Sequence, residues 1–263
     1  MSLIKNATIT IAKKKPLGRG YYRFTVGPFP KVSVIKPGQF IHLKIPDTNI
    51  YFRRAFSVYD INPKTDTIEI IFKVFGRGTA LLAKLRDGDV VDILGPLGNG
   101  FTLPRKDDTA VMVAGGIGMP PIYFLAKHLI EKGYNPDKIS YFYGGNTKDD
   151  LVDIARIRKT GVKLFPATLD GSSGFKGLVT EAIMNKIDLD AKNIRFFACG
   201  PEGMLKAVDD LARGHNIPGQ LSLEAPMPCG IGVCLGCIRP LREGGYTRVC
   251  REGPVYNIGE VIL

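Results

Sequence analysis

The sequence has few histidines, and no constellation of acid–base residues can be recognised in it. Its three histidines, His42, His128 and His215, lie far apart along 263 residues. General acid–base catalysis needs a titratable side chain within hydrogen-bonding reach of the reacting group, and nothing here groups such side chains. We therefore interpret each histidine as a surface or packing residue and predict no catalytic residue.

The sequence also lacks a long uninterrupted apolar run. The longest uncharged stretch, residues 109–126, carries three glycines and two prolines between positions 115 and 121, where a membrane-spanning helix needs continuous backbone pairing. The first 15 residues alternate polar and apolar residues and then turn basic, without the apolar core of a signal peptide. We expect no membrane association and a cytoplasmic protein whose thiols stay reduced.

Charge of one sign is in excess, but it is not concentrated in one place. The formal net charge is +11, yet basic runs such as residues 13–15 and 156–159 are short and carry no interleaved aromatic residues. Single-strand binders combine a basic groove with stacking aromatics. We therefore expect no nucleic-acid partner.

Two periodicities divide the chain, which is 44% hydrophobic and can bury one or two sizeable cores. Residues 1–103 show six alternating segments, and six such strands predict an antiparallel β-barrel. A short helix is expected at residues 80–85. The six segments are residues 7–11, 21–26, 39–45, 52–59, 67–75 and 89–94.

Residues 104–217 repeat a different unit, an apolar strand followed by a glycine turn and an amphipathic helix. This rhythm predicts a doubly wound parallel sheet with helices on both faces, whose ligands bind beyond the carboxyl ends of the strands. The expected strand and helix pairs are residues 110–114 and 120–132, 139–143 and 149–159, 163–167 and 178–186, and 194–198 and 201–213. The remaining residues, 218–263, are too few for a stable core unless a metal holds them together.

Four of the five cysteines are crowded into this last region. Cys229, Cys234 and Cys237 follow the pattern C-x4-C-x2-C, and Cys250 comes after twelve further residues. This spacing is typical of a plant-type [2Fe–2S] site. Glycines between the cysteines allow the backbone to curl and direct N–H groups at sulfur. The alternatives are a zinc site, which usually has two C-x2–4-C pairs, and a disulfide framework, which is rare in a large chain without a secretory signal.

Glycine turns follow several strands of the second region. Gly115, Gly116 and Gly118 come after the first strand and before a helix that begins with two prolines, so a pyrophosphate could approach backbone N–H groups there. Turns at residues 144–145 and 200–201 lie at the same predicted edge of the sheet. Together they predict a dinucleotide site, although the third glycine of the Rossmann fingerprint is absent.

In the predicted barrel, residues 54–57 place a cation, an aromatic ring and a hydroxyl on one strand, and residues 76–79 (GRGT) lead into the short helix. An arginine near a helix N-terminus can neutralise a diphosphate, while an aromatic side chain stacks on a flat ring. Taken alone, each of these two segments more often has a structural role.

The order of these motifs resembles the ferredoxin reductase superfamily, which holds a flavin in the barrel and a nicotinamide dinucleotide in the second domain. The cysteine loop at residues 227–237, the segment at 248–255 and the GPLGNGF segment at 95–101 resemble more specifically the electron-transfer subunit of class 1B dihydroorotate dehydrogenase. The resemblance spans the whole chain. It implies a multi-domain β plus α/β protein with an FAD-binding barrel (1–103), an NAD-binding domain (104–217) and a [2Fe–2S] domain (218–263).

The resemblance also implies cofactor contacts. FAD contacts are expected at Arg54, Ala55, Phe56, Ser57, Ile71, Phe72, Lys73, Gly78 and Thr79, NAD contacts at Gly115, Gly116, Gly118, Cys199, Gly200 and Pro201, and cluster ligands at Cys229, Cys234, Cys237 and Cys250. Cys199 is equally well interpreted as a small buried hydrophobic residue. Leu169 departs from the family pattern, which often has an acid there. NAD is favoured over NADP because the turn at residues 144–150 has no arginine for a 2′-phosphate and ends in two aspartates.

The function implied is a relay in which NAD(H) and FAD exchange a hydride and the cluster passes single electrons to or from a partner. In the family the partner is an FMN-containing subunit that oxidises dihydroorotate in pyrimidine biosynthesis, in a heterotetramer of two plus two chains. One alternative is a related reductase subunit of a hydrogenase, a sulfur or sulfite reductase or a ferredoxin transhydrogenase. Another is a non-enzymatic binding protein held together by zinc.

Overall fold

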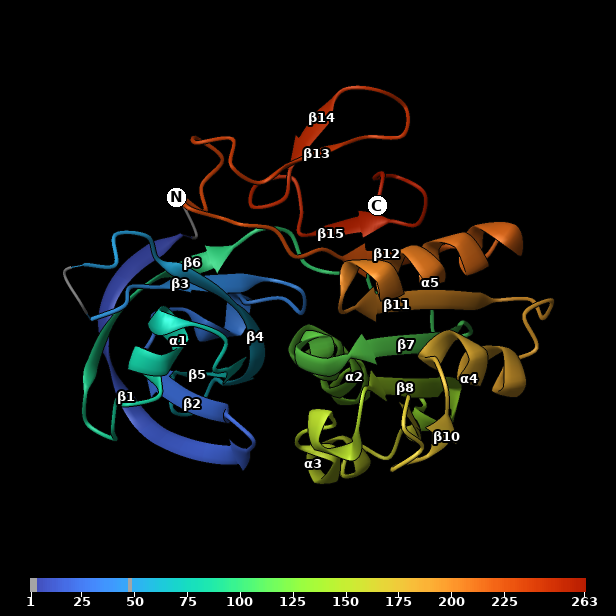
Figure 1. Cartoon of the computed structure of the whole chain (residues 1–263), viewed down its shortest axis with the longest axis horizontal. Coiled ribbons are helices and arrows are strands. Elements are labelled where there is room, and N and C mark those ends of the chain that lie inside the picture. The colour runs from blue at the N-terminus through green and yellow to red at the C-terminus, as the bar shows by residue number, and fades with distance from the viewer. Residues whose placement is uncertain (1–3, 47–48) are drawn as a thin grey trace.

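Six antiparallel strands close into a barrel, as predicted (Figure 1). The computed structural model describes residues 4–46 and 49–263. Inward-facing apolar residues such as Ile11, Phe24 and Ile70 fill the barrel, because alternate residues of a strand face one side. In barrel order, the strands are β1 (Lys5–Gly18), β2 (Tyr21–Gly27), β5 (Thr67–Lys73), β4 (Arg54–Asn62), β3 (Phe40–Leu43) and β6 (Val90–Leu97).

Strand β3 is covered on both faces. Ile41 and Leu43 belong to the barrel core, whereas Phe40 packs outside it with residues of the C-terminal tail. All four residues of the strand are therefore buried. A short 3-10 helix, η1 (Val32–Val34), precedes β3, and the helix α1 (Arg77–Leu82) follows β5, starting three residues before the predicted segment.

The second region forms a seven-stranded sheet that is parallel except at one edge. Its order is β10 (Phe175–Lys176), β9 (Lys163–Thr168), β8 (Ile139–Gly145), β7 (Thr109–Gly115), β11 (Ile194–Cys199), β12 (Gly219–Ser222) and β15 (Val255–Asn257). The strands β10, β12 and β15 are additions to the four predicted ones.

Helices cover both faces of this sheet, as a doubly wound fold requires. Met112 faces the core shared with α2 (Met119–Glu131) and α3 (Ile154–Arg158), while Val111 and Val113 face α4 (Val179–Lys186) and α5 (Glu202–Gly214). The 3-10 helices η2 (Gly116–Gly118), η3 (Pro136–Lys138) and η4 (Lys148–Asp150) lie in the connections. In the part of the chain that the structure describes, no helix has the length and apolarity needed to cross a bilayer.

The single helix expected at residues 149–159 is wrong. The segment instead forms η4 and the five-residue helix α3, separated by Asp153 in the left-handed region (φ 55°). The reason lies in the barrel, because the Asp153 carboxylate accepts hydrogen bonds from Arg23 Nη1 at 2.6 Å and from the Tyr59 hydroxyl at 3.0 Å. These contacts between domains outweigh the local helical preference.

The C-terminal tail, residues 218–263, lies across the top of both domains (Figure 1). It contains the hairpin β13 (Ile238–Pro240) and β14 (Tyr246–Arg248), and its last strand, β15, pairs antiparallel with β12. Asn99 N donates to Gly253 O at 2.6 Å, which fastens the GPLGNGF segment to the tail. Because β12 belongs to the sheet, that sheet continues past residue 217. The limits 1–103, 104–217 and 218–263 stay a prediction.

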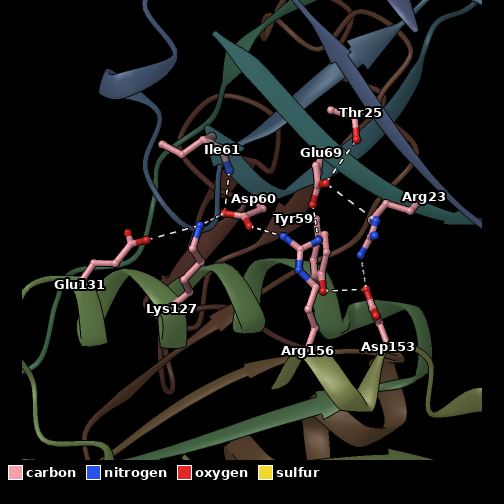
Figure 2. A network of polar contacts seen from close by, with 10 residues as sticks. All are labelled: Arg23, Thr25, Tyr59, Asp60, Ile61, Glu69, Lys127, Glu131, Asp153 and Arg156. Atoms are coloured by element: carbon pink, nitrogen blue, oxygen red, sulfur yellow. Dashed lines mark hydrogen bonds and ion pairs between the residues drawn. The ribbon is translucent and has the colours of Figure 1, made fainter. Parts of the chain in front are cut away.

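An ion-pair network joins the barrel to the second domain (Figure 2). Arg156 of α3 donates to Glu69 and, at 2.6 Å, to Asp60, both of them barrel residues. Lys127 of α2 contacts the other oxygen of Asp60 at 2.5 Å. Arg23 extends the network to Asp153. The two domains are thus held in one relative orientation.

Candidate functional site

A cavity of about 410 Å³ lies where the barrel, the sheet and the tail meet. Its volume is in the range of small-molecule and cofactor sites. Strands β4 and β5 supply its barrel wall, and six of the nine residues expected to contact FAD line it. These are Ala55, Phe56, Ser57, Ile71, Phe72 and Lys73.

The other three expected FAD contacts lie together at the start of α1. The Arg54 guanidinium packs against Gly78, where a Cβ would come within 3.4 Å of Arg54 Nε. The Thr79 hydroxyl accepts hydrogen bonds from the backbone N–H groups of Phe75 (2.9 Å) and Gly76 (3.2 Å). Thr79 therefore shapes the turn, and Arg54 holds a positive charge beside it. None of the three lines the cavity itself.

A second cavity, of about 550 Å³, lies at the carboxyl ends of the parallel strands. Gly115, Gly116, Gly118, Gly200 and Pro201 all line it, together with the turn at residues 144–145. The structure therefore brings five of the six predicted NAD contacts to one place. The backbone approach is tight, because a Cβ on Gly118 would lie 2.3 Å from the Cys199 carbonyl oxygen.

Cys199, the sixth predicted NAD contact, lines the first cavity instead. It ends β11 with only 2% of its surface exposed. Burial is the main reason why the pKa of its thiol is raised, and the nearby Glu224 carboxylate acts in the same direction. The thiol therefore stays protonated and is poorly suited to act as a nucleophile.

The two cavities share part of their walls. Lys73, Phe75, Ile117 and Glu224 line both of them. Ligands bound in the two cavities would therefore meet beside these four residues, which is the arrangement that direct transfer between a flavin and a nicotinamide requires.

Sequence reasoning missed three residues that line these cavities. Phe40 comes from β3, and Phe75 is 94% exposed although it is a large aromatic residue. Glu224 follows β12, and although the residue is exposed, the protein atoms crowded around its carboxyl group desolvate it and raise its pKa. The position of Phe75 just before the GRGT motif was a usable signal, whereas Glu224 has none in the sequence.

Ion pairs hold the turn at residues 144–150, which is expected to favour NAD over NADP. Burial would raise the pKa of Asp150, but the hydrogen bond from Lys73 and the N–H groups of Thr147 and Asn146 lower it. Asp149 pairs with Arg19 at 2.6 Å. Leu169, the departure from the family pattern, lines the second cavity.

The four clustered cysteines form two pairs. Cys237 Sγ lies 3.3 Å from Cys250 Sγ, and the Cys234 side chain interacts with Cys229. The charge of Cys229 also acts on Cys250, so the two pairs are close to each other. All five cysteines of the chain are free thiols, so no disulfide framework forms.

Backbone N–H groups point at these sulfurs. Gly236 N donates to Cys234 Sγ at 3.4 Å, and Cys250 N donates to Cys237 Sγ at 3.5 Å. Burial would raise the pKa of Cys229, but hydrogen bonds from the loop backbone outweigh it and lower the pKa to about 6. Positive φ angles at Gly230 (69°) and Gly232 (81°) produce the required curl.

Four thiolates are the donor set that a plant-type [2Fe–2S] cluster takes. Two adjacent thiolate pairs suit a cluster in which each iron takes two cysteines.

Fold and cavities together define a flavin- and nicotinamide-dependent oxidoreductase of the ferredoxin reductase type, and three family models match accordingly. They are an oxidoreductase FAD-binding domain (residues 10–101), an oxidoreductase NAD-binding domain (112–210) and the iron-sulfur cluster binding domain of dihydroorotate dehydrogenase B (224–262). FAD, NAD and an iron–sulfur cluster are thus the groups that this chain is built to bind, as predicted.

Full-length relatives identify the family. The chain is 38% identical over 272 residues to the dihydroorotate dehydrogenase B (NAD(+)) electron transfer subunit of Geobacillus kaustophilus, with 99% of this chain and 100% of the relative covered. It is also 38% identical to the subunit of the same name from Enterococcus faecalis, with 98% and 99% covered. The chain belongs to the family of dihydroorotate dehydrogenase B electron transfer subunits.

Solved structures agree with this fold. An NADH-dependent reduced ferredoxin-NADP oxidoreductase superimposes with a TM-score of 0.86 at 30% identity, covering 97% of this chain and 90% of the other. The ferredoxin reductase of carbazole 1,9a-dioxygenase superimposes with a TM-score of 0.71 at 19% identity, covering 81% and 67%, and supports the fold alone.

Proposed function

We propose that this chain carries electrons between NAD+ and an FMN-containing partner subunit that oxidises dihydroorotate, in pyrimidine biosynthesis. When bound, FAD exchanges a hydride with the nicotinamide and single electrons with the [2Fe–2S] cluster. The protein binds these groups, orients them and excludes water.

The single observation that carries the proposal is the mixed wall of the first cavity. Phe56 and Lys73 come from the barrel, Cys199 from the NAD-binding domain, and Met227 and Pro254 from the tail. Met227 lies two residues before the first cysteine of the loop. A flavin in this cavity would therefore touch both the nicotinamide side and the cluster side of the molecule.

Each group of predicted residues takes one part of this work. The proposed cluster ligands are Cys229, Cys234, Cys237 and Cys250, and the proposed FAD contacts are Arg54, Ala55, Phe56, Ser57, Ile71, Phe72, Lys73, Gly78 and Thr79. Arg54 neutralises the diphosphate and the β4–β5 wall holds the flat ring. Gly115, Gly116, Gly118, Gly200 and Pro201 leave room for NAD(H), and Cys199 lies at the flavin end as a neutral thiol.

The partner and the assembly belong to the same proposal. The names of the full-length relatives, which are electron transfer subunits, support a separate catalytic subunit, and we propose a heterotetramer of two plus two chains. We also propose a cytoplasmic location, because free thiols must remain available to iron.

Anaerobic co-purification tests the proposal. The chain should capture an FMN-containing subunit, and the complex should form NADH from NAD+ only when dihydroorotate is added. In the isolated chain, Cys237→Ser should lower the iron content from about two per chain, whereas Cys199→Ser should leave it unchanged. A colourless wild-type preparation containing zinc would contradict the cluster assignment.

A related reductase subunit remains the second candidate. The observation in its favour is the 30% identity and full-length superposition with the NADH-dependent reduced ferredoxin-NADP oxidoreductase. Reduction of a ferredoxin by NADH without any dependence on dihydroorotate would support it over the first.

A further inference from the structure

His42 is fully buried and has no hydrogen-bond partner. It lies on β3 with 0% of its surface exposed, and neither ring nitrogen is bonded to any described residue. Burial, with a contribution from Arg53, lowers its pKa to about 4, so the neutral ring carries one N–H donor and one lone pair. Buried polar groups are rarely left unpaired, so this one calls for a partner.

The nitrogen-bearing edge of the ring faces the cysteine loop. A Cβ built on Gly230 would lie 2.4 Å from His42 Cε1, 2.7 Å from Nδ1 and 2.9 Å from Nε2. Cε1 is the ring carbon between the two nitrogens, so the whole N–C–N edge is directed at Gly230. Gly230 directly follows Cys229, and only a residue without a side chain leaves room for this approach.

The fold of the barrel aims His42 outward. Ile41 and Leu43 face the barrel core, so Phe40 and His42 face the opposite side, where the tail covers β3. A register shift between β3 and β6 occurs at residues 40–42, and such irregularities redirect side chains. Phe40 lines the flavin cavity and its ring lies 5.6 Å from that of His42. The two residues span from the cavity to the cysteine loop.

We propose that His42 is a positioning residue for the iron–sulfur site, donating its N–H to a sulfur held in the cysteine loop. Hydrogen bonds to sulfur stabilise the more negative, reduced form of a cluster and raise its reduction potential. The flavin domain would thereby tune a cluster that is bound by another part of the chain. This inference rests on the proposed cluster ligands.

The inference is tested directly by pulsed EPR of the reduced holoprotein, produced in cells supplied with 15N-histidine. Because the chain has only three histidines, a nitrogen coupling can be assigned with single variants. We expect a weak nitrogen coupling to the cluster in the wild type that is lost in His42→Phe. Redox titration should show a lower cluster midpoint potential in His42→Phe, an unchanged flavin potential, and a smaller shift in His42→Gln, which keeps an N–H donor. His215→Gln is the matched control, because His215 lies on the surface beside Asp190.

A wild-type spectrum without coupling from His42, or with the strong coupling of a directly bound nitrogen, would overturn the inference. An iron-loaded His42→Phe with the wild-type potential would overturn it as well. If His42→Phe proves unable to hold iron, His42→Gln decides the matter. If His42→Gln keeps both the iron and a near-wild-type potential, the role of His42 as a donor is supported. If both variants lose the iron but keep the flavin, the inference is contradicted. A wild-type chain without iron would instead refute the cluster assignment itself.

Discussion

The rings of Tyr59 and Tyr123 stack with their centroids 4.4 Å apart and their planes 29° apart. Tyr59 belongs to β4 of the barrel and Tyr123 to α2 of the NAD-binding domain, so this pair is a contact between domains. The Arg156 guanidinium lies over both rings, at 5.0 and 5.6 Å from their centroids. Because the two cavities share walls from both domains, this packing also holds the two cavities in a fixed relative position.

The first prediction concerns Arg156, which links the rings to Asp60 and Glu69. Arg156→Ala should destabilise the protein by about 3 kcal/mol, because it leaves two largely buried carboxylates without a shared cation. Lys127 still pairs with Asp60 and limits the loss. Urea unfolding of the FAD-loaded protein measures it, and stopped-flow reduction of FAD by NADH should be slower because the domains are less firmly held.

The control for Arg156→Ala is Lys206→Ala. Lys206 pairs with Asp210 on the exposed side of α5, where removing one partner should cost less than about 1 kcal/mol. Equal losses in the two variants would mean that the junction network contributes nothing beyond a surface ion pair. Arg156→Lys should fall between them, because one ammonium cannot bond both carboxylates in the same geometry.

Much of the fold could be predicted because period and turn chemistry act locally. Alternation at residues 21–26 and 67–75 fixes strands, and the glycines at 115–118 fix a turn that leads into a helix. The break in the helix at Asp153 could not be predicted, because it depends on Arg23 and Tyr59, which lie 130 and 94 residues earlier in the chain. Similarly, Gly219–Ser222 forms a strand only because β11 offers it an edge.

The residues of the candidate site also fall into two groups, those that the local sequence identifies and those that it does not. The cysteine spacing and the glycine turns carry their chemistry in the local sequence, so their residues could be proposed from it, and the structure brings the glycine turns to one cavity. Glu224 and His42 gain significance only from what the fold places against them: two cavities in one case and Gly230 in the other. No local pattern distinguishes them from an ordinary surface acid or a packing histidine.

The second prediction concerns Phe75, whose ring is 94% exposed where the two cavities join. Phe75→Ala should leave the stability of the flavin-free protein nearly unchanged, because little burial is lost. It should weaken FAD binding about fivefold, as expected for the loss of an aromatic contact worth about 1 kcal/mol. Fluorescence titration with FAD measures this. Tyr51→Ala is the matched control, because Tyr51 is 88% exposed and lines a different cavity.

The third prediction concerns pH and Glu224. Glu224 is an exposed residue, but the cavity wall around its carboxyl group desolvates it and raises its pKa in the folded state, so the folded protein binds the proton more tightly than the unfolded chain does. The stability that this group contributes is therefore present below its unfolded pKa and is lost as pH rises through the folded value. Glu224→Gln should raise the melting temperature relative to the wild type more at pH 8 than at pH 5. Glu243→Gln in the exposed β13–β14 turn controls for loss of a surface charge, and an equal gap at both pH values would refute the prediction.

The fourth prediction concerns the close approach of two loops at Gly118. A Cβ there would lie 2.3 Å from the Cys199 carbonyl oxygen and 2.5 Å from its carbon, and backbone atoms cannot move aside as a flexible side chain could. Gly118→Ala should therefore force the loops apart, cost about 1–3 kcal/mol of stability and weaken NADH binding. Gly203→Ala is the matched control: a Cβ there meets nothing within 4 Å, and the residue lies in α5, so alanine should stabilise the protein by about 0.5–1 kcal/mol. Thermal unfolding and NADH titration of both variants decide the matter, and unaltered NADH affinity in Gly118→Ala would show that this loop does not shape the dinucleotide site.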